Sequence, residues 1–227
     1  MKKYVLFALT VILITSCSTS GKFTRGKNYP GIYAEKPVSI LVMPPINNTV
    51  NVEAKEYFYT SLAVPLCERG YYVISPFLAM DILRSESAYD SEMFINGDLS
   101  SFKKVFGTDV ALFTVINKWN KSVIGSTITV DIEYILKSTS TNEVLFNRKG
   151  ELTVNTGINS GSGGLAGMLV DMAASAINTA LTDKVIAARR CNSFVIKDLP
   201  DGVYAPMFGK DQDVHAGDVI FSGYVKQ

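Results

Sequence analysis

The sequence has 227 residues, with 22 basic side chains, 21 acidic side chains and one histidine, which give a formal charge of +1. This near balance, without any basic cluster, gives no support for a protein that holds nucleic acid by charge. A single histidine and three cysteines without a Cys-x-x-Cys motif also argue against a histidine-based catalytic triad and a dithiol redox site.

The N-terminus has the charged, apolar and small-residue order of an export signal. Lys2 and Lys3 precede an almost uninterrupted apolar run from Val5 to Ile14. That run is too short to span a bilayer, which takes about 20 residues. We therefore interpret residues 1–16 as a signal peptide, whose removal leaves 20 basic and 21 acidic side chains.

The end of this signal resembles the bacterial lipobox, because Ile14-Thr15-Ser16 leads into Cys17. Small residues fit a peptidase site, and the thiol of Cys17 can form the thioether to diacylglycerol. The alternative is an ordinary signal with a chance cysteine. Ser18 stands where an aspartate retains enteric lipoproteins in the inner membrane, so we expect a periplasm-facing protein on the outer membrane. Residues 17–36 are predicted to be a flexible tether, and residues 37–227 a single domain with a C-terminal extension.

The remaining cysteines, Cys67 and Cys191, are candidates for a disulfide, since an envelope compartment is oxidising. A bond that closes so long a loop contributes roughly 4 to 5 kcal/mol in the chain-entropy model. The alternative is two buried free thiols, because Cys67 lies in an apolar stripe.

The first half of the domain predicts alternating strands and helices. An apolar run that ends at Pro44-Pro45 indicates the first strand, and Pro65 is expected to kink or end the first long helix. The expected elements are a strand at Val38–Met43, a helix at Val52–Glu68, a strand at Tyr71–Ile74, a helix from Ser75-Pro76 with Leu78, Ile82 and Leu83 on its apolar face, a loop at residues 86–97, and a helix from Asp98 to Phe106 that Gly107 ends.

The second half predicts a three-strand meander, because strictly alternating apolar and polar residues indicate half-buried antiparallel strands. A long helix with many small residues follows, suited to close packing on the sheet or on another subunit. The expected elements are strands at Val110–Trp119, Thr127–Lys137 and Val144–Asn155, a helix at Leu165–Ala188, and a strand or extended tail over Val219–Tyr224. This order predicts an α+β fold, a mixed α/β sandwich with helices on a mixed sheet.

Two motifs resemble ligand-binding sites, a glycine-rich run and an acidic cluster, and each also has a purely structural interpretation. The run Gly161 to Ala166 fits the G-x-G-x-x-A pattern of a dinucleotide site, but it follows a meander, so a hinge is the better interpretation. Asp211, Asp213, His215 and Asp218 could hold a cation, yet the EF-hand spacing and a second histidine are missing, which favours a solvated turn. We therefore expect no catalytic residue, cofactor or metal.

Three consecutive aromatic residues, Tyr57, Phe58 and Tyr59, cannot all face one side of a helix. Either one or two of them face a partner, since aromatic residues dominate interface energetics, or they are partly buried with their hydroxyls at the rim.

Several segments together resemble a family of bacterial lipoproteins that includes a neisserial surface antigen. They are the strand end Pro44-Pro45-Ile46-Asn47-Asn48-Thr49, the run Gly107-Thr108-Asp109-Val110 with Trp119 closing its strand, the Gly163-Gly164-Leu165 helix start and Phe208-Gly209-Lys210-Asp211. The first strand and the Gly-x-Asp strand are also distantly similar to the curli secretion-channel lipoproteins and to the N-terminal domain of the Tol-Pal translocation protein. The resemblance implies an α/β domain, an accessory role in envelope assembly or secretion, and a curli-channel-like lipoprotein as partner. It supplies no catalytic residues, and we expect Trp119 to serve packing.

These observations predict a non-enzymatic lipoprotein that binds other envelope lipoproteins or itself as a homo-oligomer, and no nucleic acid. The alternatives are a periplasmic ligand-binding protein or an enzyme that acts on cell-wall glycans through carboxylates, and a surface-exposed adhesin.

Overall fold

The computed structural model describes residues 23–122, 127–156 and 184–225. The helices are α2 (Arg25–Asn28), α3 (Pro30–Glu35), α4 (Ala54–Ser61), α5 (Ala63–Glu68), α6 (Pro76–Ser85), a 3-10 turn (Ser91–Met93), α7 (Ser100–Phe106) and the helix of residues 184–196. The strands are β1 (Ser39–Val42), β2 (Ile46–Asn47), β3 (Tyr72–Val73), β4 (Val110–Lys121), β5 (Thr127–Ser138), β6 (Val144–Asn155) and β7 (Ile220–Val225).

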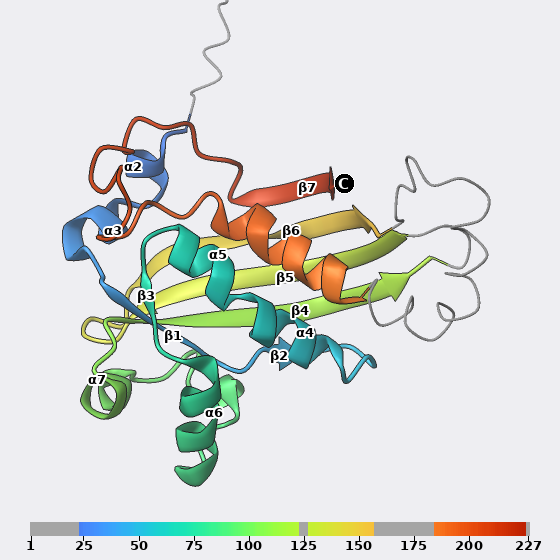
Figure 1. The fold of residues 1–227 in the computed structure, drawn as a ribbon, viewed down its shortest axis with the longest axis horizontal. Coiled ribbons are helices and arrows are strands. Elements are labelled where there is room, and N and C mark those ends of the chain that lie inside the picture. The colour runs from blue at the N-terminus through green and yellow to red at the C-terminus, as the bar shows by residue number, and fades with distance from the viewer. Residues whose placement is uncertain (1–22, 123–126, 157–183, 226–227) are drawn as a thin grey trace, which may run out of the picture.

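These strands form one mixed sheet in the order β3-β1-β4-β5-β6-β7, with β2 beside β4 (Figure 1). The long strands β4, β5 and β6 are an antiparallel meander, as their alternating residues predict. β1 is parallel to both β3 and β4, and β7 is parallel to β6. The predicted α+β class, with helices against a mixed sheet, is confirmed.

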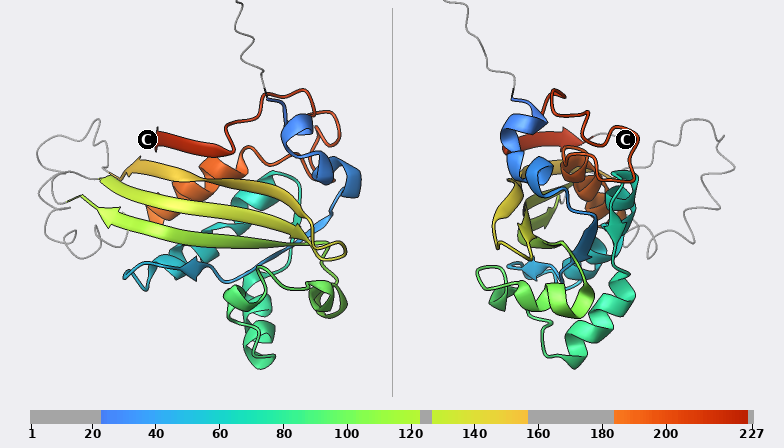
Figure 2. Two further views of the ribbon diagram at one scale, coloured as in Figure 1. Left: turned by 180° about the vertical axis from the view of Figure 1, so that it is seen from behind. Right: turned by 90° about the vertical axis from the view of Figure 1, so that its left-hand side faces the viewer.

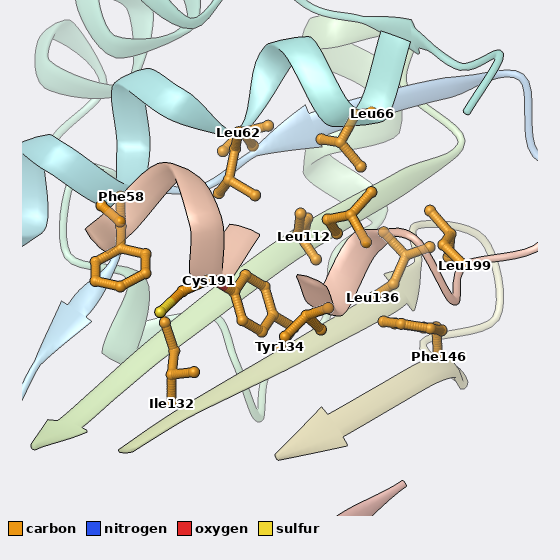
Figure 3. Close-up of a cluster of buried hydrophobic side chains, with 14 of the residues drawn as sticks. Phe58, Leu62, Leu66, Leu112, Ile132, Tyr134, Leu136, Phe146, Cys191 and Leu199 are labelled. Carbon is orange, nitrogen blue, oxygen red and sulfur yellow. The ribbon is translucent and has the colours of Figure 1, made fainter. Parts of the chain in front are cut away.

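The main core lies between one face of the sheet and the helices α4, α5 and 184–196 (Figures 1 and 3). Alternate residues of β5, including Ile132, Tyr134 and Leu136, are buried beneath these helices, where they meet Phe58 and Leu62 of the α4–α5 segment. The alternation of apolar and polar residues in the sequence therefore predicted the buried face of this strand correctly.

A second, smaller core lies on the other side of the sheet. There α6 and α7 cover only the β1 and β4 region, and they project from the body of the domain (Figure 2). The buried members of this cluster are Leu41, Met43, Ala79, Leu83, Leu99, Phe102, Ala111 and Phe113. The rest of that sheet face carries polar side chains, such as Thr129 and Glu133, which are half-buried.

The predicted helix over Val52–Glu68 is interrupted. α4 ends at Ser61 and α5 begins at Ala63, two residues before Pro65. Proline has no N–H to donate four residues back, and its ring clashes with the carbonyl of that residue, here Ser61. The expected effect of Pro65 is therefore confirmed, and the chain keeps nearly the same direction through the break (Figure 1).

Part of the segment expected to be a tether is folded. α2 and α3 pack on the domain, and Tyr29 and Ile32 are buried in the main core. Gly31 lies so close to Leu145 of β6 that an added Cβ would stand 2.8 Å from its Cδ2 atom. The prediction of a flexible tether is wrong for residues 23–36, because these apolar side chains find partners on a distant strand.

The run Gly107-Thr108-Asp109, which carried part of the family resemblance, forms a structural corner. Gly107 ends α7 with a φ of +64°, a left-handed conformation that glycine adopts without strain. The Asp109 carboxylate then accepts hydrogen bonds from the backbone N–H groups of Val38 and Ser39, at 3.0 and 3.1 Å, and from the Ser39 hydroxyl. The motif thus joins α7, β1 and β4.

The last helix is described from residue 184, and it continues to residue 196, eight residues beyond its predicted end. Cys191 and Val195 continue the helical spacing of buried positions, and Pro200 follows the end. The Gly161 to Ala166 motif and the small-residue part of this helix lie outside the described residues, as does Cys17. Within the described ranges, no helix is long and apolar enough to cross a membrane.

Candidate interaction surface

The acidic cluster predicted as a solvated turn is divided by the structure. Asp213, His215 and Asp218 are exposed, whereas Asp211 is 1% exposed. In the described part of the chain, no three acidic, histidine or cysteine side chains stand together as a metal site would need. The solvated-turn prediction is therefore wrong for Asp211, which has an internal structural role.

Asp211 is the centre of a buried ion network between the N-terminal helices and the loop of residues 199–219. Its Oδ2 atom accepts from Arg25 Nη1 and from the backbone N–H of Asp201, both at 2.9 Å, and its Oδ1 atom accepts from the Tyr33 hydroxyl at 3.0 Å. Arg69 pairs with Asp201 at 2.7 Å. Both carboxylate oxygens of Asp211 are engaged, so it serves as an anchor for these segments and not as a base.

Burial in this network shifts the pKa values of two of its members, Tyr33 and Arg69. Burial, reinforced by the nearby Asp211 carboxylate, raises the pKa of Tyr33 above its usual value, so the hydroxyl stays protonated and donates to Asp211. Burial also lowers the pKa of Arg69. A guanidinium remains charged at any physiological pH, so Arg69 keeps its charge throughout that range.

A second buried pair fixes the end of the last helix. Arg148 of β6 donates to the carbonyls of Val195, at 3.1 Å, and Asp218, and its Nε atom lies 3.5 Å from the Asp198 carboxylate. Asp198 also accepts from the Tyr29 hydroxyl at 2.9 Å. Cations near the last carbonyls of a helix stabilise its C-terminus, and Arg148 does so from the sheet.

The disulfide predicted between Cys67 and Cys191 is not formed. Both are free thiols in the structure, Cys67 exposed on α5 and Cys191 buried in the main core (Figure 3). Burial raises the pKa of the Cys191 thiol, so it behaves as a small apolar side chain. The alternative of two buried thiols is also wrong for Cys67, because the α4–α5 segment turns Leu62 and Leu66 inward and leaves Cys67 exposed.

The three consecutive aromatic residues are not a partner surface. Phe58 and Tyr59 are both buried, and Tyr57 is half-buried with its hydroxyl bonded to Glu53 at 3.0 Å. Trp119 packs edge-on against Phe58, with ring centroids 5.5 Å apart, as a packing role predicts. The partial-burial alternative is the nearer description of this segment.

A group of exposed apolar side chains lies on α6 instead. Phe77 is 81% exposed, Leu78 58% and Ile82 38%, while Ala79 and Leu83 of the same helix are buried. Leu78 and Ile82 are four residues apart, so they share one helix face. We call Phe77, Leu78 and Ile82, together with the exposed Val105 of α7, the α6–α7 surface.

An apolar groove of about 220 Å³ continues this surface between the two helices. Ile82 and Val105 lie on its walls, Phe94 and Phe102 contribute aromatic rings, and Glu86 is its one charged side chain among the described residues. The groove has room for one or two apolar side chains of another molecule. Exposed apolar side chains beside an apolar groove are the mark of a candidate interaction site.

The sequence reasoning missed this surface because it assigned Leu78, Ile82 and Leu83 together to the core side of the helix. Only Leu83 is buried, on the stripe that it shares with Ala79. The sequence did contain a signal of this surface. The apolar stripe of Leu78, Ala79, Ile82 and Leu83 is wider than the contact that α6 makes with β1. The sequence does not reveal how little of α6 the sheet covers.

Comparison with known proteins identifies the relatives of this chain. Residues 27–203 match the family described as "Putative lipoprotein GNA1162-like". The chain is 25% identical over 186 residues to "Putative lipoprotein NMB1124/NMB1162" of Neisseria meningitidis serogroup B, across 81% of this chain and 85% of that protein.

Two solved structures are similar. The crystal structure of lipoprotein GNA1162 from Neisseria meningitidis is 25% identical and aligns with 63% of this chain and 99% of its own, at a TM-score of 0.48. A PelC dodecamer from Paraburkholderia phytofirmans is 15% identical over 67% of this chain and 89% of its own, at a TM-score of 0.36. Because the family match spans residues 27–203, well over half of the 227 residues, this protein belongs to the GNA1162-like lipoprotein family.

Proposed function

We propose that this protein is a lipid-anchored, non-enzymatic accessory of an envelope assembly or secretion complex, and that it binds a second envelope protein through the α6–α7 surface. The observation that carries the proposal is the exposure of Phe77, Leu78 and Ile82 beside an apolar groove. Membership of a lipoprotein family supports the anchor.

The anchor is assigned to Cys17, on the lipobox pattern that ends there. Each acyl methylene that enters the bilayer contributes about 0.8 kcal/mol, so two or three chains hold the protein stably. Ser18 supports outer-membrane sorting under the enteric rule, with the domain in the periplasm. Labelling cells with radioactive palmitate tests this part: the wild-type protein takes up label, and Cys17→Ala does not. Equal labelling of the two would refute the assignment.

The geometry suits a partner that approaches an anchored domain. α2, the first described helix, and α6 lie at opposite ends of the molecule in all three views (Figures 1 and 2). Because the proposed lipid lies on the α2 side, the α6–α7 surface points away from the membrane. We assign it to an apolar segment of a second envelope lipoprotein, for which a curli-channel-like lipoprotein is the first candidate.

The expected energetics fit a specific contact. Full burial of an aromatic or leucine side chain contributes about 1.5 to 3 kcal/mol, so Phe77 and Leu78 alone offer enough for an anchor in the partner's surface. Affinity then depends on how well the groove between α6 and α7 is filled and not on area alone.

Photocrosslinking in living cells tests this surface. A photoreactive residue is placed at Leu78 of the full-length lipoprotein, or as a control at Thr129 on the polar face of the sheet. We expect Leu78, and not Thr129, to form an adduct with one envelope protein, and Phe77→Ser in the same chain to abolish it. An adduct with a second copy of this chain would assign the surface to a homo-oligomer. No adduct from Leu78, or equal adducts from both positions, would refute the proposal.

A ligand-binding role is the second candidate, because a cavity of about 200 Å³ opens between α3 and the loop of residues 201–212. Tyr33, Tyr71 and Phe208 line it with aromatic rings, and Asp201 and Lys210 add polar groups. Asp201 is paired with Arg69, which favours binding over carboxylate catalysis. Thermal-shift screening with cell-wall glycan fragments tests this role, since ligands that bind only the folded state raise its melting temperature.

A further inference from the structure

A larger cavity, of about 400 Å³, lies where α2 and the loop of residues 214–217 meet β6 and the end of the last helix. It is distinct from the α6–α7 groove and shares no lining residue with it. Basic side chains from three separate segments reach it: Arg25 from α2, Arg148 from β6 and Lys197 from the end of the last helix. His215 lies on its wall as well.

The charge of this cavity is unbalanced. Among the described residues that line it, Asp198 is the only carboxylate, and it is engaged by the Tyr29 hydroxyl, the Gly217 N–H at 2.8 Å and Arg148. The Arg25 charge is compensated from outside the cavity by Asp211. Lys197 is exposed, and its ammonium adds a positive charge that no lining carboxylate is left to balance.

One buried donor of a residue that lines this cavity lacks an acceptor. Arg25 Nη1 donates to Asp211, and Arg25 Nη2 donates to the Lys197 carbonyl at 2.8 Å. The Arg25 Nε–H is buried and has no hydrogen-bond acceptor within the described ranges. Buried charged donors are almost always paired, so an orphaned guanidinium N–H beside a cavity indicates an acceptor from another molecule.

The position of the cavity relative to the anchor limits which classes of ligand are expected there. This step rests on the lipidation of Cys17 proposed above. The loop that lines the cavity holds the start of the described chain, because the Phe23 carbonyl accepts from the Ala216 N–H at 2.8 Å. Six residues, Cys17 to Lys22, precede Phe23, and even a fully extended chain of that length reaches only about 20 Å. Phe23, 60% exposed, and the exposed Val214 would then face the lipid.

We propose that this cavity is a phosphate-binding site that takes the headgroup phosphate of a membrane phospholipid or a free phosphate ion. The phosphate oxygens accept from Arg25 Nε and from the Lys197 ammonium, with His215 beside them. Charge-assisted contacts of this kind are among the stronger hydrogen bonds in proteins. A headgroup held there would orient the domain on the bilayer, with the α6–α7 surface outward.

Calorimetric titration of the full-length lipoprotein in a phosphate-free nonionic detergent tests the site. The probes are inorganic phosphate and dihexanoylphosphatidylglycerol, a short-chain phospholipid. We expect Lys197→Gln to weaken binding by about fivefold or more, and His215→Gln to weaken it independently. Lys27→Gln is the matched control, since Lys27 is an exposed lysine of the neighbouring helix α2 that does not line this cavity.

The outcomes separate the two sources. Tighter binding of the phospholipid assigns the site to a membrane headgroup, and equal or tighter binding of inorganic phosphate assigns it to the free ion. No binding of either probe at millimolar concentration, or binding that Lys197→Gln and His215→Gln leave unchanged, overturns the proposal. Neither soluble probe needs the lipid on Cys17, so a negative result here leaves the anchor intact, and a failed palmitate assay leaves this site intact.

Discussion

The two ends of the molecule put their side chains to opposite uses. At the α2 end, charged groups are buried and paired, Arg25 with Asp211 and Arg148 with Asp198. At the α6 end, apolar groups such as Phe77 and Leu78 are exposed to solvent. The paired charges therefore hold segments of the chain together, whereas the exposed apolar groups are the contacts that we propose for another molecule. Substitutions of the paired charges should therefore reduce stability, and substitutions of the exposed apolar groups should reduce binding.

The largest expected effect is at Asp211. Asp211→Asn removes the counter-charge of a buried arginine, and breaking a buried pair in this way costs about 3 to 5 kcal/mol. Urea unfolding should show the loss as a lower midpoint. Asp213→Asn, two residues away and exposed, serves as the control and should stay within about 0.5 kcal/mol of wild type. A small effect at Asp211 would mean that the ion network does not hold the α2 end.

A matched pair within α6 tests the other half of the comparison. Leu83 is 0% exposed and Leu78 is 58% exposed on the same helix. Leu83→Ala should destabilise the domain by about 2 to 5 kcal/mol, because it opens a space in the smaller core. Leu78→Ala should change stability by less than about 0.5 kcal/mol while weakening partner capture. Similar losses at both positions would show that the α6–α7 surface is part of the fold.

A smaller effect is expected at Tyr33, whose hydroxyl donates to Asp211 at 3.0 Å. Tyr33→Phe removes one hydrogen bond to a charged acceptor but keeps the ring, so the loss should be about 1 to 2 kcal/mol. Unfolding of Tyr33→Phe, Asp211→Asn and the double variant forms a thermodynamic cycle. If the two losses simply add, the Tyr33 hydroxyl is not coupled to the network.

The smallest effect concerns pH at the start of α7. Hydrogen bonds from the Ser100 hydroxyl, the Asn142 amide and the Ser100 N–H lower the pKa of Asp98 to about 2. A depressed pKa in the folded state stabilises it above the unfolded value near 4, and this contribution disappears as pH falls toward 2. Asp98→Ala should thus be less stable than wild type at pH 6, with the difference shrinking in acid. The exposed Asp90→Ala is the control.

The sheet meander could be predicted from the sequence almost to the residue. Val110–Lys121, Thr127–Ser138 and Val144–Asn155 were found within two residues of their predicted ends. Strict alternation indicates both the element and its buried face, because each strand residue points to the side opposite its neighbour. The kink at Pro65 and the turn at Gly107 were equally local, since each follows from the backbone chemistry of one residue.

The candidate site could not be predicted in this way, because it depends on contacts between distant segments. Residues 23–36 are rich in polar and small side chains, and nothing nearby in the sequence indicates that Tyr29 and Ile32 are buried. Asp211 lies among other aspartates, and its burial follows only from its meeting with Arg25. Likewise, the exposure of Leu78 depends on how far the sheet extends beneath α6, which periodicity does not encode.

The bond between Arg25 and Asp211 joins positions 186 residues apart in the chain. Contacts of such high sequence separation form late in folding, because the entropy of closing the intervening loop must be overcome before the contact contributes. The meander and its helices can associate earlier, through near neighbours. The segment of α2 and α3 would therefore be the last part of the described chain to become ordered. Under the lipidation of Cys17 proposed above, this late ordering would leave the processing and acylating enzymes access to the N-terminal region until the loop of residues 199–219 reaches α2.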